Sequence, residues 1–182
     1  MLKTRAHRYM LSAGALLTLG LSSCGVSTVT QCNNFSEVVK QGEEFQAEFE
    51  AEMESFGQNF AGAGELEGLK NMASGYRDAV GRVVTKIDAM STDLEALELP
   101  DETLAAFRDR YTDVTTQFAQ ELQNTSEAMG LIQNVESEAD LIPAVTKFQE
   151  QAMGSFTNLE QLSTQGDTLT TEINTYCTEA AG

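Results

Sequence analysis

Few side chains in this sequence have types and spacings that could do chemistry. The chain contains three cysteines, Cys24, Cys32 and Cys177, together with one histidine, His7, and no tryptophan. A cysteine thiol can carry a lipid, form a disulfide or bind a metal, and histidine is a common base and metal ligand. The histidine lies within the first ten residues, far in the sequence from the other reactive groups. The cysteines are therefore the first candidates for functional residues.

Cys24 ends a segment that has the three parts of an export signal. An apolar run over residues 10–21 closes with Leu21, and two small residues, the second of them Ser23, lead into the cysteine. This stretch resembles the lipobox of bacterial lipoproteins, which implies cleavage between Ser23 and Cys24 and lipidation of Cys24. A retained membrane span and an ordinary signal peptide are the alternatives, although the run is short for a span of roughly 20 residues. The positive residues that begin the segment are Lys3, Arg5 and Arg8.

Cys32 and Cys177 remain once Cys24 is assigned to the lipid, and they lie near the two ends of the mature chain. An exported protein meets an oxidising environment in which disulfides persist. We therefore predict a Cys32–Cys177 disulfide, which would bring the two ends of the domain together, with two separate thiols as the alternative. In the chain-entropy description, closing a loop of this length stabilises the fold by about 5 kcal/mol.

Charge is the next constraint on function. The full chain has a formal net charge of -17, and removing residues 1–23 takes away three basic residues and no acid, which lowers the charge to -20. Nucleic acid is therefore not expected as a partner, because phosphate binding needs clustered Lys and Arg side chains. About 159 residues would remain, which fits one domain with a core of its own.

Apolar residues recur at helical spacing in four stretches, which predicts an all-α protein. The first stretch covers residues 35–56, with Asn33 and Asn34 as possible caps, and residues 57–64 are rich in glycine and alanine, as in a connection. The second stretch, residues 66–97, alternates steps of three and four residues throughout, as in a heptad seam.

Two prolines mark the later helix boundaries. Pro100 is expected to end the second helix and to stand in the first turn of a third helix that runs through Leu104 to Ile132. Asp140 is expected to cap a fourth helix with Pro143 in its tolerated first turn. Gly166 could bend or interrupt this last helix near its middle.

These elements predict an antiparallel up-down four-helix bundle that is closed by the terminal disulfide and follows a cleaved lipoprotein signal peptide. The expected domains are a signal peptide at residues 1–23, a lipidated tether at residues 24–31 and an acidic bundle at residues 32–182. The up-down topology and the disulfide both place the chain ends at one pole, so the two predictions agree. The alternative is an elongated three-helix coil on which the first helix, expected to be the shortest, docks loosely.

Catalytic residues, a metal site and a cofactor are not expected. Without a histidine, the mature chain cannot supply the ligands of carboxylate-histidine di-iron bundles, and no nucleophile elbow or phosphate-binding glycine loop occurs. The aromatic residues on the helical stripes are expected to pack in the core. A ligand cavity between the helices, near small seam residues such as Ala73 and Ala152, is the alternative. These aromatic residues are Phe45, Phe49, Tyr76, Phe107, Tyr111, Phe118, Phe148 and Phe156.

Three short segments resemble those of small helical lipoproteins from cyanobacteria. They are Gln31-Cys32-Asn33, the residues around the central turn (97–99, 101–102 and 104), and Ile173-Asn174-Thr175-Tyr176-Cys177. The resemblance implies a thylakoid-lumen or periplasmic setting and offers no activity.

We therefore expect an extracytoplasmic protein that is anchored to a membrane by the lipid on Cys24. It would lie at the outer membrane, on the periplasmic face or in the thylakoid lumen, and it would act without catalysis. An acidic bundle surface would bind a basic or cationic protein partner through long-range attraction that weakens with salt. The alternatives are a carrier of a small apolar ligand or cation within the bundle, and a purely structural envelope protein.

Overall fold

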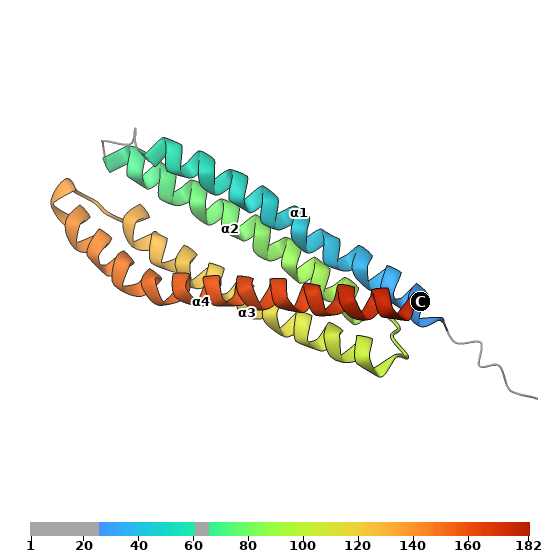
Figure 1. Cartoon of the computed structure of the whole chain (residues 1–182). Helices are drawn as coiled ribbons and strands as arrows, with labels where there is room; N and C mark the ends of the chain where they lie inside the picture. The colour runs from blue at the N-terminus through green and yellow to red at the C-terminus, as the bar shows by residue number, and fades with distance from the viewer. Residues whose placement is uncertain (1–25, 61–65) are drawn as a thin grey trace, which may run out of the picture.

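The described part of the chain, residues 26–60 and 66–182 of this computed structural model, consists of four long helices (Figure 1). In α1 the side chains are described as far as Gly42 and at Glu44, Ala47, Phe49, Ala51 and Glu54 beyond it. The helices span Thr28–Phe60 (α1), Leu66–Glu95 (α2), Glu102–Gln133 (α3) and Glu138–Ala180 (α4). Successive helices run in opposite directions, so the predicted all-α, up-down four-helix bundle is confirmed.

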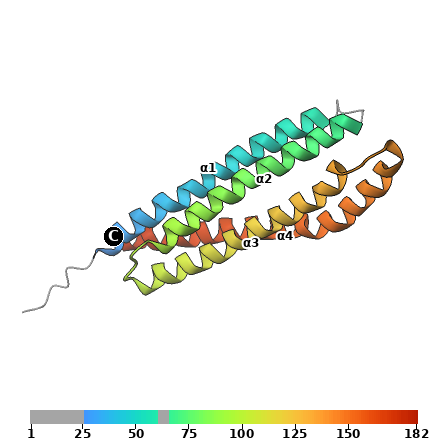
Figure 2. The ribbon, with the colours of Figure 1, turned by 180° about the vertical axis from the view of Figure 1, so that it is seen from behind.

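The predicted disulfide joins the two ends of the domain. Cys32 in α1 is bonded to Cys177 in α4, and their Cα atoms lie 5.6 Å apart. We call this end, which also contains the α2–α3 connection at residues 96–101, the disulfide pole. The opposite end, which contains the α3–α4 connection at residues 134–137, is the far pole. From behind, the start of α1 and the end of α4 are again seen to meet at the disulfide pole (Figure 2).

The heptad seam of α2 forms the centre of the core. Its side chains pack against α1 on one side and α3 on the other, and α3 in turn packs along α4. Fully burying a large aliphatic or aromatic side chain stabilises the fold by roughly 1.5 to 3 kcal/mol, so a continuous seam of this kind can hold the long helices together. The buried seam residues are Ala73, Tyr76, Val80, Val83, Ile87, Met90 and Leu94.

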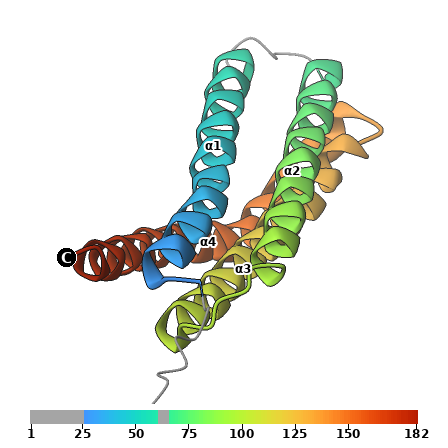
Figure 3. The same ribbon diagram turned by 90° about the vertical axis from the view of Figure 1, so that its right-hand side faces the viewer.

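In the first turns of α1, Cys32, Phe35, Val38 and Val39 are buried in the core, and Phe49 farther along the helix packs against it. Further along, α1 follows α2 and diverges from α4 (Figure 3). The α1–α2 pair and the α3–α4 pair spread apart toward the far pole (Figure 1). At 33 residues, α1 is longer than α2 and α3, not the shortest helix as expected.

Both limits of α1 lie outside the predicted range. The helix begins at Thr28, where the Ser27 hydroxyl accepts a hydrogen bond from the Thr30 N–H at 3.2 Å, and it ends at Phe60. Residues 28–31 of the predicted tether are therefore helical, and Asn33 and Asn34 lie inside the helix. The cause is tertiary, because Gln31 is buried at the disulfide pole and its amide oxygen accepts a hydrogen bond from the Asp101 N–H at 3.0 Å.

Both proline positions also differ from the prediction. Asp101 is the N-cap of α3, so Pro100 precedes the helix and is not in its first turn. Helix α4 begins at Glu138 after Ser137, which places Asp140 inside the helix and makes Pro143 its sixth residue. Pro143 is exposed, so the carbonyl that its missing N–H leaves unpaired can bind water. The helix then continues through Gly166 without a break.

Candidate functional site

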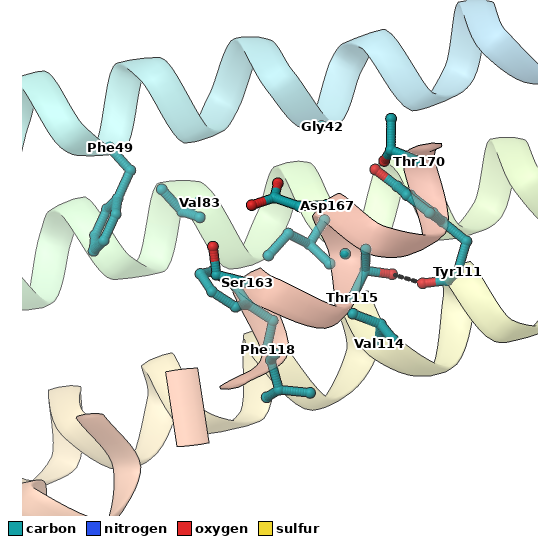
Figure 4. Close-up of a pocket in the computed structure, with 13 residues that line it drawn as sticks. Gly42, Phe49, Val83, Tyr111, Val114, Thr115, Phe118, Ser163, Asp167 and Thr170 are labelled. Carbon is teal, nitrogen blue, oxygen red and sulfur yellow. Dashed lines mark hydrogen bonds between the residues drawn. The ribbon is translucent and has the colours of Figure 1, made fainter. Parts of the chain in front are cut away.

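A cleft of about 300 Å³ lies among the four helices near the middle of the bundle (Figure 4). This volume is at the lower end of the range of roughly 300 to 1,000 Å³ that is typical of small-molecule sites. Each helix contributes to the walls, which are formed by Gly42 and Phe49 from α1, Val83 and Ile87 from α2, Tyr111, Val114, Thr115 and Phe118 from α3, and Leu162, Ser163, Gly166, Asp167 and Thr170 from α4.

Most of the cleft surface is apolar, and its deepest part belongs to the core. Ile87 is only 1% exposed and Val83 5% exposed, so the core residues that surround them hold the α2 wall of the cleft in place. Phe49 and Phe118 are partly buried and pack against the same core. In Figure 4 these two rings lie toward one end of the cleft, and Tyr111 lies toward the other. A ligand between them would be held largely by apolar contact.

The polar groups of the cleft come mainly from one face of α4. Ser163, Asp167 and Thr170 are spaced four and three residues apart, and within the described residues their side chains make no hydrogen bond. On α3, the Thr115 hydroxyl donates to the Tyr111 carbonyl at 3.0 Å, which leaves only its oxygen lone pairs for a ligand. The described lining thus offers hydroxyl groups and one carboxylate, and no basic side chain.

Two glycines help to keep this space open. Gly42 on α1 is buried and Gly166 on α4 is partly buried, and both line the cleft. A Cβ atom at Gly166 would meet the Val114 Cγ1 atom at 4.0 Å, which is an ordinary contact, so no close backbone approach requires glycine there. In contrast, Ala73 and Ala152, which were expected to leave space, are 0% exposed and do not line the cleft.

The aromatic residues of the helical stripes have different positions. Phe49, Tyr111 and Phe118 line the cleft, and the others that are described lie elsewhere in the bundle. The prediction of a core position is wrong for Phe156, which is 49% exposed. The inward position on that turn belongs to the neighbouring Ser155, which is 7% exposed and bonds Glu121. The side chain of Phe45 lies outside the described residues.

A second group of polar side chains links three segments at the disulfide pole. The Asp101 carboxylate caps α3 by accepting from the backbone N–H groups of Thr103 and Leu104. It also accepts from the Tyr176 hydroxyl of α4 at 2.9 Å and the Thr28 hydroxyl of α1 at 3.2 Å. The Asp101 N–H donates to the Gln31 amide oxygen at 3.0 Å.

These contacts shift the pKa values of Asp101 and Tyr176. The hydrogen bond from the Leu104 N–H is the largest influence that lowers the pKa of Asp101, and those from Tyr176 and Thr28 add to it. The bond to Asp101 raises the pKa of Tyr176. Sequence reasoning missed this cluster. An acid directly after Pro100 at a helix start indicates a cap, but nothing in the sequence pairs it with residues more than seventy positions away.

The predicted processing site, Ser23 and Cys24, lies outside the described residues, whereas Cys32 and Cys177 are brought together as predicted. The described helices include none that is long and apolar enough to cross a membrane. Across residues 26–60 and 66–182, no three His, Cys, Asp or Glu side chains are arranged so that they could hold a metal ion.

Residues 30–174 match the model of a protein family described as Uncharacterised lipoprotein PM1805. The chain belongs to this lipoprotein family. The matched range contains Cys32 and every residue of the cleft, and it stops before Cys177. No curated protein and no solved structure gives a significant match. The expected bacterial lipoprotein is thus confirmed at the level of the family, and the resemblance to cyanobacterial lipoproteins stays a prediction.

Proposed function

We propose that this lipoprotein is a non-enzymatic binding protein of the cell envelope, anchored by a lipid on Cys24, that holds a small and largely apolar ligand in the cleft. The observation that supports this proposal is the cleft itself. It combines apolar walls from all four helices with a few hydroxyl groups and the Asp167 carboxylate on one side. Convergent polar groups in an apolar pocket are typical of small-molecule sites.

The chemistry of the lining specifies the class of ligand. An elongated apolar body would contact Phe49, Phe118 and Ile87, whereas a hydrogen-bond donor or a positively charged group would face Asp167. An anionic ligand is disfavoured, because the described lining contains one carboxylate and no cation to offset it. We therefore expect a neutral or cationic amphipathic molecule.

The length of the segment between Cys24 and α1 limits how far the bundle, and with it the cleft, would stand from the membrane. Helix α1 begins at Thr28, four residues after Cys24, and a chain of that length spans at most about 14 Å. The disulfide pole would then face the membrane closely, and the cleft would stand farther from it along the bundle. A ligand could reach this position from the membrane surface without passing through the core.

Native mass spectrometry of the full lipoprotein, purified from membranes, tests the cleft. The wild-type protein should carry the added mass of a small ligand. Gly166→Leu should lose that mass, because the new side chain would fill the space beside Val114. Gly154→Leu is the matched control on the same helix, since a Cβ there meets nothing within 4 Å. An apo mass for all three proteins would contradict the proposal.

The lipid anchor has its own test. A Cys24→Ala variant should be released from membranes or remain uncleaved, because the thiol that accepts the lipid is missing. Fractionation followed by intact-mass measurement would distinguish the two results. Normal cleavage together with unchanged membrane residence would refute the assignment of the lipid to Cys24.

A second candidate function uses the charge of the bundle. Apart from Asp101 and Glu121, every acidic side chain that the structure describes is exposed. Such a surface favours encounter with a basic partner protein, and screening by salt should weaken that encounter. Affinity capture from membranes at low salt should recover a basic protein that elutes when the salt concentration is raised. Recovery of no partner at low salt would count against this function.

A further inference from the structure

A polar groove runs between α3 and α4 on the outside of the bundle, and its lining differs from the rest of the surface. Helix α3 contributes Gln117, Gln120 and Asn124, and Glu121 lies between them. The spacing of these residues, with steps of three and four, places them on one face of the helix. In a chain with 28 acidic residues, a face formed mainly by uncharged amides is unusual.

Helix α4 repeats the same arrangement from the other side. Asn158, Gln161 and Gln165 line the groove with the same spacing, and Leu162 is the one apolar residue among the described lining. Seven positions along a helix correspond to roughly 10 Å, so the amides extend over about that length. The two helices are antiparallel, and the two sets of amides therefore form opposite walls of one groove.

A fixed carboxylate lies between these walls. Glu121 accepts from the Asn158 amide of α4 at 2.9 Å and from the Asn124 amide of its own helix at 3.1 Å. The buried Ser155 hydroxyl is its third donor, and these hydrogen bonds, with that of Ser155 the largest, lower the pKa of Glu121. A carboxylate has about four acceptor sites, so Glu121 can still accept from a ligand while its position is held.

The remaining amides are available for binding. Within the described residues, the side chains of Gln120, Gln161 and Gln165 make no hydrogen bond to the protein. Each amide presents two donors and an acceptor, a combination that suits neighbouring hydroxyl groups, which both donate and accept. The described lining has no cation for a phosphate or carboxylate ligand, and it has too little apolar surface for a lipid chain.

Peptides are a poorer match than polyhydroxylated ligands. An extended peptide is usually recognised at the edge of a sheet, and a helical peptide needs a row of apolar pockets. A groove between two helices has no sheet edge, and Leu162 alone cannot supply such a row. From these contacts we infer that the amide groove binds a neutral glycan, through Gln120, Gln161 and Gln165 together with the fixed Glu121 carboxylate.

This site is separate from the cleft of the proposed function, although Leu162 borders both. Binding of the N-acetylglucosamine trimer to the full lipoprotein, kept in a zwitterionic detergent without sugar groups, tests the inference by titration calorimetry and ligand-observed NMR. A double variant, Gln120→Ala with Gln161→Ala, removes amides that have no partner in the described protein, so the fold should be kept. The matched control is Gln149→Ala with Gln151→Ala, two exposed amides of α4 outside the groove.

The wild-type and control proteins should bind the trimer, and the groove variant should bind about tenfold or more weakly, because two hydrogen-bonding groups are lost. Circular dichroism confirms that the variants remain helical. Absence of saccharide binding by the wild-type protein would overturn the inference, and so would equal binding by the groove variant and the control. Tetra-alanine is the competing probe, and preference for this peptide over the saccharide would assign the groove to peptides instead.

Discussion

The two poles of the bundle are held together in different ways. At the disulfide pole, α1, α4 and the α2–α3 connection are joined by the Cys32–Cys177 bond and by the hydrogen bonds of Asp101. At the far pole the described contacts join fewer helices. There the Tyr76 hydroxyl and the Thr125 hydroxyl form a buried hydrogen bond at 2.6 Å between α2 and α3, and Arg77 donates to Gln133.

Exposure of apolar side chains follows this division only in part, since Val26 and Val29 near the disulfide pole are 45% and 39% exposed, whereas Ile132 and Val135 near the far pole are buried. Phe35, Leu94 and Leu104, toward the disulfide pole, are 0% exposed. On the half of α4 nearer the far pole, Ile142 is 77% and Met153 69% exposed. Among the described residues, the disulfide and the hydrogen bonds of Asp101 therefore lie at the end that carries the predicted membrane anchor. The cleft lies between the two regions, where α1 begins to leave α4.

Removal of the disulfide should have the largest effect on stability among the tests of the difference between the two poles. Reduction, or a Cys32→Ser and Cys177→Ser double variant, should destabilise the protein by up to about 5 kcal/mol, because the unfolded chain regains the freedom that the closed loop removed. Thermal unfolding followed by circular dichroism, with and without a reductant, measures the loss. The double variant should not respond to the reductant. An unchanged melting temperature of the reduced wild-type protein would show that the chain ends are not coupled.

A pair of phenylalanine substitutions compares the buried core at the disulfide pole with the exposed face of α4. Phe35→Ala should cost roughly 3 to 5 kcal/mol, because the ring is fully buried and makes an edge-to-face contact with Tyr111 at a centroid distance of 6.4 Å. Phe156→Ala should change the free energy of unfolding by less than about 1 kcal/mol, since Phe156 is 49% exposed. Urea unfolding of both variants measures the difference. Equal losses of unfolding free energy in the two variants would contradict the difference in packing between the two regions.

The smallest expected effect on stability is its dependence on pH through Asp101. The pKa of Asp101 is lowered in the folded protein, so its contribution to stability is present above the ordinary aspartate pKa and is lost as the pH falls through the lowered value. Asp101→Asn should therefore be less stable than wild type near pH 7, and the two should converge as the pH falls below the lowered pKa of Asp101. Urea midpoints across this range measure the convergence. Glu98→Gln, an exposed acid in the same connection, controls for the loss of one negative charge.

Sequence patterns predicted the parts of the fold that depend on periodic burial. The seam from Ala73 to Leu94 is buried as expected, since a three-four spacing keeps one stripe of a helix facing its neighbours. The disulfide was predictable from the number and position of the cysteines. The start of α1 was not, because Val29 and Thr30 have weak helix propensity and contacts of Gln31 with the α2–α3 connection outweigh it.

The candidate sites depend on contacts that periodicity cannot reveal. Phe49, Tyr111 and Phe118 were predicted to pack in the core, with a cavity near Ala73 and Ala152 as the alternative. The cleft that they line lies instead beside Gly42 and Gly166, on helices that separate along their length. The amide groove has the same origin. Each helix shows its amides at regular spacing, yet only the antiparallel pairing of α3 with α4 places the two sets opposite one another.

The Cys32–Cys177 bond also determines how the molecule responds to a pulling force. A load applied between the N-terminal segment and the last residues of α4 passes through this bond, because it joins α1 near its first residue to α4 near its last. The helices between the two cysteines then lie outside the path of the load. With the predicted lipid on Cys24, a partner that binds residues 178–182 could pull against the membrane without unfolding the bundle, whereas one that binds the far pole would pull along the helices themselves.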